Sequence, residues 1–220
     1  MPRISFFYDF TSPYTYLAAT QIDSVVAKHG LTVAWEPALL GGIMKAVGNT
    51  PPALLPARGD YMLQDLSRWA ALYRVPFVFS PHFPLNSMGA LRGAIGVRDR
   101  APQRLGKYNE LMFRAAWVEG RDIAQKDVLQ SIAEQAEIAP EIVLSANDSV
   151  DVKEQLKAQT QRAIALGAFG MPWIVVEEGD AREGYFGNDR LALLDERLAR
   201  KAPWPNAGMR SLDTSRLKSP

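Results

Sequence analysis

The sequence predicts an α/β fold whose strands come from the two ends of the chain and whose middle is entirely helical. Strand-like apolar runs occur at residues 4–7 and 31–36 and return only at residues 171–176 and 182–186. Between these runs, apolar residues recur at helical spacing from residue 61 to residue 166. The predicted order is therefore β-α-β, a helical block, and then β-β-α.

The first strand leads directly into a helix whose start is marked by Ser12 and Pro13. Serine is a common N-cap, and proline suits the first helical position. Apolar residues at helical spacing up to Val26, followed by Gly30 as a typical terminator, predict one helix over residues 13–29. A hydroxyl therefore stands at the positive end of a helix, where an anion such as a thiolate is favoured. The alternative is that Ser12 only caps the helix.

The region after the second strand carries two polar candidates for binding. Residues 48–59, GNTPPALLPARG, contain enough proline and glycine to predict an ordered but irregular loop. Such loops commonly carry binding groups, and Asn49 and Arg58 are the candidates in this one. The alternative is that Asn49 is a turn residue and Arg58 is a solvated surface arginine.

The helical block is predicted to start at residue 61. Its first helix has an apolar face of Leu63, Leu66, Ala70 and Tyr73, with Trp69 beside it. Three prolines then break the helix within residues 74–84. Helical spacing returns in four further segments, residues 85–98, 105–118, 127–137 and 150–166.

The late strands are entered through Pro172 and are followed by a final helix. Asn188 is a natural N-cap for that helix, and Asp189 favours its dipole. This order is the thioredoxin topology split by a helical domain. We therefore predict a thioredoxin-like domain from two separate pieces, a helical insertion and a C-terminal tail, with the bounds 1–60 and 168–202, 61–167 and 203–220.

Composition excludes several classes of function. The 220 residues include no cysteine, so the chain cannot exchange a dithiol with a disulfide or bind a metal through thiolates, and two histidines leave little for a metal. A net charge of +1, with both signs interspersed, lacks the basic footprint of a nucleic-acid binder. No apolar stretch approaches the length of a membrane helix, and the amino terminus is predicted to be a core strand without a cleavage region. A cytoplasmic protein is the default expectation.

Five segments, taken together, resemble a known family. The turn SPYT in DFTSPYTYLA is similar to the active-site turn of DsbA-like thioredoxin-fold proteins, with hydroxyls at both sulfur positions. GIMKAVGNTPPALLPARGDYM, DLSRWAALYRVPF, AFGMPW and FGNDRL follow in the expected order. Together they resemble the glutathione-dependent 2-hydroxychromene-2-carboxylate isomerases and the related kappa-class glutathione transferases. The loop is closer to the transferases, and DLSRWAALYRVPF is closer to the isomerases.

The resemblance implies a set of residues that bind glutathione. Ser12 corresponds to the serine that meets the sulfur and stabilises the thiolate. Arg58 stands where the family usually has lysine, near the glycyl carboxylate, and arginine changes the reach and the geometry of that contact. The other implied contacts are Asn49 in the loop, the backbone of Met171 before a cis Pro172, and Asn188 with Asp189 at the γ-glutamyl end.

The resemblance also implies the reaction. The isomerases interconvert 2-hydroxychromene-2-carboxylate and trans-o-hydroxybenzylidenepyruvate, with glutathione as a cofactor, whereas a kappa transferase or peroxidase consumes it. An aromatic carboxylate substrate would need an apolar pocket, for which Trp69, Phe77, Phe79 and Trp173 are possible walls. A homodimer is implied as well. A third possibility, a non-catalytic thioredoxin-fold binding module, does not explain why the full set of residues implied to bind glutathione is present.

Overall fold

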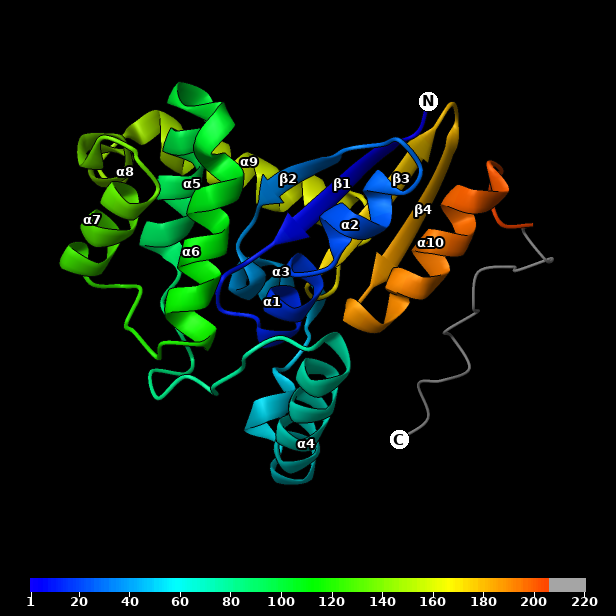
Figure 1. Cartoon of the computed structure of the whole chain (residues 1–220), viewed down its shortest axis with the longest axis horizontal. Helices are drawn as coiled ribbons and strands as arrows, with labels where there is room; N and C mark the ends of the chain where they lie inside the picture. Colours follow the sequence, from blue (N-terminus) through cyan, green and yellow to red (C-terminus); the bar gives the residue numbers. More distant parts are fainter. Residues whose placement is uncertain (206–220) are drawn as a thin grey trace.

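The computed structural model describes residues 1–205 of the chain. Its centre is a four-stranded sheet with the strand order β2-β1-β3-β4 (Figure 1). β1 runs parallel to β2, whereas β3 is antiparallel to both β1 and β4. The predicted sheet with strands from both ends of the chain is thereby confirmed. The strands are β1 (Arg3–Tyr8), β2 (Val33–Pro37), β3 (Trp173–Glu178) and β4 (Ala181–Phe186).

Helices surround the sheet and fill the chain between β2 and β3. Figure 1 shows α5 to α8 gathered on the β2 side of the sheet and α4 projecting beneath it. The helices are α1 (Pro13–Ala19), α2 (Ile22–Ala27), α3 (Leu40–Val47), α4 (Pro56–Tyr73), α5 (Met88–Arg100), α6 (Leu105–Trp117), α7 (Lys126–Gln135), α8 (Pro140–Ala146), α9 (Val150–Ala165) and α10 (Leu191–Arg200). Short 3₁₀ turns occupy Pro52–Leu54, Pro102–Arg104 and Asn188–Arg190.

The side chains of β1 alternate between two apolar cores. Phe6 and Tyr8 belong to the larger core, which continues into the helical block. Phe7 belongs to a smaller core that also contains Ile43 of α3 and Ala163 of α9. Because both faces of the sheet are covered, β1 is a nearly continuous apolar run rather than an alternating one.

Asp9, directly after β1, holds three distant segments together. Its buried carboxylate accepts hydrogen bonds from Thr11 N at 3.1 Å, from Leu40 N at 2.8 Å and from the hydroxyl of Ser87. Burial raises the pKa of Asp9, while these three donors act in the opposite direction. The turn before α1 is thereby fixed to the start of α3 and to the segment before α5.

The single helix predicted over residues 13–29 is wrong. The structure has two helices, α1 and α2, with a break at Thr20 and Gln21. The side-chain hydroxyl of Thr20 donates to Leu17 O at 2.7 Å, and Gln21 N donates to Ala18 O at 3.0 Å. These shorter-range bonds replace the α-helical pattern, which is how a threonine commonly interrupts a helix.

The irregular loop predicted over residues 48–59 is correct only in part. α4 begins at Pro56, because proline at a first helical position starts a helix as readily as it ends one. The predicted apolar face of α4 also shifts, since Leu63 is exposed and Met62 is buried with Leu66 and Ala70. α8 was not predicted, because its two turns are too short to show a period.

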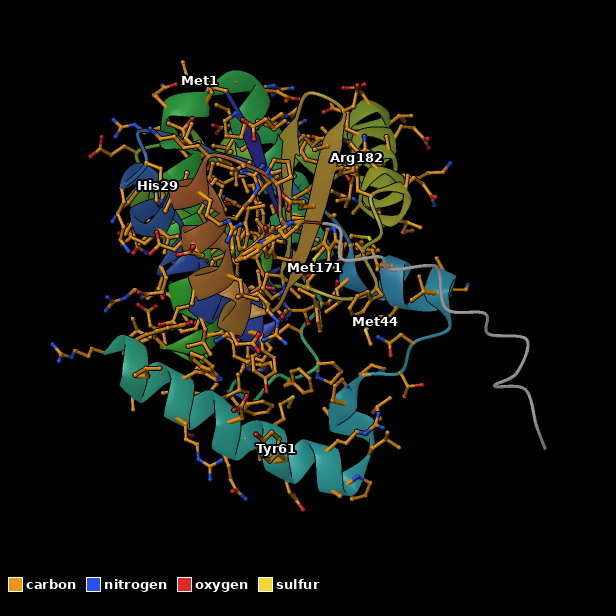
Figure 2. The ribbon with its side chains drawn as sticks, turned by 90° about the vertical axis from the view of Figure 1, so that its right-hand side faces the viewer. Met1, His29, Met44, Tyr61, Met171 and Arg182 are labelled. Carbon is orange, nitrogen blue, oxygen red and sulfur yellow. The ribbon has the colours of Figure 1, made fainter. Side chains whose placement is uncertain are left out.

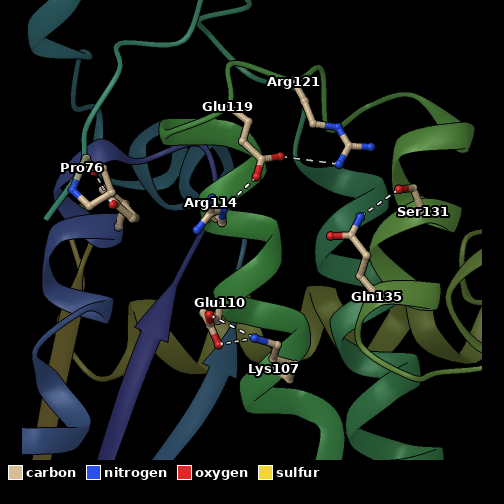
Figure 3. A network of polar contacts seen from close by, with 9 residues as sticks. Pro76, Lys107, Glu110, Arg114, Glu119, Arg121, Ser131 and Gln135 are labelled. Atoms are coloured by element: carbon tan, nitrogen blue, oxygen red, sulfur yellow. Dashed lines mark hydrogen bonds and ion pairs between the residues drawn. The ribbon is translucent and has the colours of Figure 1, made fainter.

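The outer surface of the helical block is charged. Figure 3 shows Lys107 beside Glu110, and Glu119 bonded to both Arg114 and Arg121. These pairs are largely exposed, so each stabilises the fold by little. Among residues 1–205 no helix is long and apolar enough to cross a membrane.

The end of the described chain packs on β4. Trp204 N donates to Glu183, and its indole donates to the hydroxyl of Tyr185 at 3.0 Å. Glu183 and Glu178 also bind the guanidinium of Arg197, which is buried. Of the predicted tail 203–220, residues 206–220 lie outside the described residues.

Candidate functional site

A cleft of about 600 Å³ lies between the sheet and α4. Figure 2 shows Tyr61 on α4 and, across from it, Met44 and Met171 on the body of the protein. All three line the cleft, together with segments from both ends of the chain. The cleft is lined by residues 11–14, 40, 44, 49, 51–53, 61, 62, 65, 69, 83, 170, 171 and 186–189.

Ser12 lies at the start of α1 and lines the cleft. It caps the helix, because its Oγ accepts a hydrogen bond from Thr15 N at 3.1 Å. The same hydroxyl donates to Met171 O at 3.3 Å. Only 4% of Ser12 is exposed, so the hydroxyl is fixed and largely shielded from water. The two interpretations of Ser12 are thus compatible, since it caps the helix and also lines the cleft.

Met171 and Pro172 are joined by a cis peptide bond, as the resemblance implies. The resemblance also implies that the backbone of Met171 contacts glutathione. The carbonyl already accepts the hydroxyl of Ser12, so it has a partner in this structure. Met171 lines the cleft together with Ser12 at the start of α1. The hydrogen bond between them brings together the two segments that the sequence singled out, the turn at Ser12 and the entry to β3 at Pro172.

Asn49 lines the cleft from the loop after α3. Its side-chain amide donates to Phe169 O at 3.0 Å, and its Oδ1 accepts from Thr50 N at 2.9 Å. The residue therefore ties the loop to the segment that precedes Met171. It acts as a turn residue and as a lining residue at once.

Arg58 does not line the main cleft. It is exposed in the first turn of α4 and borders a smaller recess with Tyr14, Ala57 and Tyr61. Tyr14 and Tyr61 line both the recess and the cleft, so the two spaces are neighbours.

Asn188 and Asp189 line the far end of the cleft. Asn188 is not the N-cap that the sequence predicts: it begins a 3₁₀ turn, and α10 starts at Leu191. Its amide instead donates to the hydroxyl of Tyr73 at 3.4 Å. Asp189 forms an ion pair with Arg190 beside it. The turn needs Gly187, because φ is +97° there and an added Cβ would lie 2.5 Å from Asp189 Oδ1.

Several cleft residues were not identified from the sequence. Tyr14 donates to Oδ2 of Asp65 at 2.9 Å, which links α1 to α4. Burial, with the hydrogen bond and charge of Asp65, raises the pKa of Tyr14, so its hydroxyl stays protonated. Tyr61, Asp65 and Trp69 are spaced by four residues on α4 and share one face. Because Trp69 was already a candidate wall, this four-residue spacing could have identified Tyr61 and Asp65 from the sequence.

The aromatic walls are partly those expected. Trp69 lines the cleft, and Phe83 lines it without having been predicted. Phe77 and Phe79 instead pack against Trp117 in the larger core. Trp173 packs against Phe169 behind the cleft. The remaining walls of the cleft are largely apolar, and its only charged side chains among residues 1–205 are Asp65 and Asp189.

The chain is similar over most of its length to two kinds of protein. It is 31% identical over 210 residues to human "Glutathione S-transferase kappa 1", covering 91% of this chain and 93% of that protein. It is 31% identical over 202 residues to "2-hydroxychromene-2-carboxylate isomerase" of Pseudomonas putida, covering 90% and 94%. A solved structure of a 2-hydroxychromene-2-carboxylate isomerase superposes with a TM-score of 0.80 at 29% identity, covering 90% of this chain and 95% of that chain.

These similarities agree with the thioredoxin-like fold and its helical insertion. The DSBA-like thioredoxin domain matches residues 3–199, which include all four strands and the helices between them. The chain belongs to the DSBA-like thioredoxin domain family, and its homologues include both kappa-class glutathione transferases and 2-hydroxychromene-2-carboxylate isomerases.

Proposed function

We propose that the protein is a glutathione-dependent enzyme that uses the cleft beside Ser12. The observation that carries this proposal is the Ser12 hydroxyl, fixed in a largely apolar cleft beside Met171 O. A hydroxyl there can donate to a sulfur anion, and the start of α1 adds a favourable partial charge. To do so, the hydroxyl must turn away from Met171 O. Because the chain has no cysteine, the thiol has to come from a cofactor.

The groups around Ser12 suit an extended anionic tripeptide. At the loop end, Asn49 offers an amide, and Arg58 offers a cation from the neighbouring recess. At the other end, Asp189 suits an ammonium group, and the turn beginning at Asn188 suits a carboxylate. The proposed glutathione contacts are therefore Ser12, Asn49, Arg58, Met171, Pro172, Asn188 and Asp189.

The reaction proposed first is the isomerisation of 2-hydroxychromene-2-carboxylate. Bound glutathione would supply a thiolate that adds reversibly to a conjugated carbon, so that the neighbouring bond can rotate before the thiol leaves. Ser12 would hold the sulfur ionised, and Trp69, Phe83 and Met62 would hold the aromatic ring in an apolar wall. The segments DLSRWAALYRVPF and AAWVEGRDI favour this reaction, because both resemble the isomerases, whereas the loop GNTPPALLPARG resembles the transferases.

A kappa-type transferase is the second candidate, and one observation favours it. Within the described chain, no cationic side chain lines the main cleft, whereas Asp65 does. Because Arg58 is assigned to the glycyl carboxylate of glutathione, a carboxylate substrate would have no cationic partner among the described lining residues, while an uncharged electrophile would need none. In that case the thiol would remain attached to the product.

The stoichiometry of glutathione separates the two reactions. We expect the purified protein to convert 2-hydroxychromene-2-carboxylate over many turnovers with glutathione far below the substrate concentration. Free thiol should stay constant while the ultraviolet spectrum changes to that of the trans product. Loss of one thiol per product would contradict the isomerase and support the transferase. The absence of glutathione-dependent turnover of either kind would contradict the proposed function.

The proposal extends to organisation and location. We propose the division into a thioredoxin-like part, residues 1–60 and 168–202, and a helical part, residues 61–167, because the cleft lies where the two meet. A homodimer and a cytoplasmic location are proposed from the resemblance and from the use of glutathione, which buffers the cytosol. Size-exclusion chromatography with light scattering tests the dimer, and fractionation tests the location.

A further inference from the structure

Tyr73, the last residue of α4, is bonded to a residue 115 positions later in the chain. Its hydroxyl donates to Asn188 O at 3.0 Å and accepts from Asn188 Nδ2 at 3.4 Å. Asn188 is only 2% exposed, so these groups are largely shielded from water. One hydroxyl therefore bonds both its backbone carbonyl and its side-chain amide. Within residues 1–205, that side-chain amide has no other hydrogen-bond partner.

The turn that Tyr73 holds is the end of the cleft. Asn188 and Asp189 both line it, and Gly187 before them has a φ of +97°, which glycine adopts readily. Burial raises the pKa of Tyr73, the hydrogen bond with Asn188 lowers it, and the nearby charge of Asp189 raises it.

Tyr73 also contacts the opposite wall of the cleft. Its ring lies 5.3 Å from that of Trp69, centroid to centroid, one turn earlier on α4. Trp69 lines the cleft, whereas Tyr73 does not. Tyr73 thus stands behind the cleft and fixes the turn at Asn188 relative to α4 without itself facing a ligand.

We propose that Tyr73 is a positioning residue for the γ-glutamyl end of glutathione, acting through Asn188. This inference rests on the proposed function. Without the hydroxyl, the buried Asn188 amide and carbonyl lose a partner, and the turn that carries Asp189 is free to shift. The cysteinyl and glycyl contacts at Ser12, Met171 and Asn49 lie on other segments and are not held by Tyr73.

The test compares two thiols that differ only in the γ-glutamyl group. Isothermal titration measures the binding of glutathione and of cysteinylglycine to the wild type and to Tyr73→Phe. We expect Tyr73→Phe to weaken glutathione about threefold to tenfold, as for one lost hydrogen bond, and to leave cysteinylglycine unchanged. Tyr108→Phe is the matched control, because that hydroxyl also donates to a backbone carbonyl, Ala90 O, at 3.0 Å, but it lies on α6 and does not line the cleft.

Each alternative result has a distinct meaning. Equal weakening of both thiols, or unchanged glutathione affinity in Tyr73→Phe, would overturn the positioning role and leave the proposed function intact. Failure of the wild type to bind glutathione at all would overturn both. If Tyr73→Phe does not fold, Tyr73→Leu removes the same hydroxyl instead. It should also weaken glutathione selectively, and equal loss of both thiols would again overturn the proposal.

Discussion

The hydroxyl of Ser12 donates to Met171 O at 3.3 Å and so joins the start of α1 to the segment before β3. We expect a bound thiolate to compete with Met171 O for that hydroxyl, because a serine hydroxyl has only one proton to donate. Ser12 is therefore the residue whose removal is most informative.

We expect Ser12→Ala to lower turnover about tenfold to a hundredfold, the usual effect of losing a hydrogen bond to a charged group. Ultraviolet absorbance of the bound thiolate should show a raised thiol pKa. Because Ser12 is also an N-cap, Ser149→Ala is the control: Ser149 caps α9 through Val152 N at 3.3 Å, far from the cleft. A bound thiol with the same pKa in the wild type and in Ser12→Ala would reduce Ser12 to a cap.

Arg58 provides a second test, because it borders the recess rather than the cleft. If its guanidinium pairs with the glycyl carboxylate, Arg58→Ala should raise the KM for glutathione about threefold to tenfold, and Arg58→Lys should restore much of the loss. Arg68→Ala is the control, since Arg68 is exposed on the same helix and donates to Gln64 Oε1 at 3.4 Å. Titrations of Arg58→Ala that match the wild type would show a merely solvated arginine.

The pair Tyr14–Asp65 should be energetically coupled. We expect Tyr14→Phe and Asp65→Ala, combined in a double-mutant cycle, to show a coupling of about 1 kcal/mol in the free energy of unfolding measured in urea. The control pairs Tyr14→Phe with Asp60→Ala, because Asp60 is exposed on α4 and should be additive. Additivity in both cycles would mean that the hydrogen bond contributes nothing to stability.

Asp9 predicts a pH dependence of stability. Because its pKa is raised in the folded protein, the folded chain binds more protons than the unfolded chain from the ordinary value of 3.8 upward. Its contribution to the free energy of unfolding is therefore fully present below 3.8 and is lost as the pH rises through the folded pKa. Urea unfolding from about pH 4 to pH 8 should show a more negative slope for the wild type than for Asp9→Asn. Identical slopes would contradict this assignment.

The local parts of the site could be predicted from the sequence, because their signals are local. Ser12 before Pro13 marks a helix start wherever it occurs, and the proline at position 172 marks the entry to a strand. Residues 48–59 were predicted to be a loop throughout, although α4 begins at Pro56. Proline is common both in turns and at helix starts, so its presence does not distinguish the two. The packing of α4 on α1, which the sequence does not show, favours the helix.

The long-range pairs could not be predicted. Tyr73 looks like the last apolar residue of a helix, and Asn188 looks like an N-cap, yet each finds its partner in the other. Asp9 gives no sign that its carboxylate would be buried under three donors. Such contacts join residues that are far apart in the sequence. The local spacing and propensities of a single sequence do not indicate which distant residues meet.

The position of β1 in the sheet has a consequence for synthesis of the chain. β1 lies between β2, which follows it closely, and β3, which is made more than 130 residues later. A chain that stops before Trp173 therefore leaves one edge of an apolar strand without a partner. Bare edges of this kind pair with other chains. Products truncated after α4 but before β3 should accordingly aggregate, although they already contain Ser12 and the whole of α4.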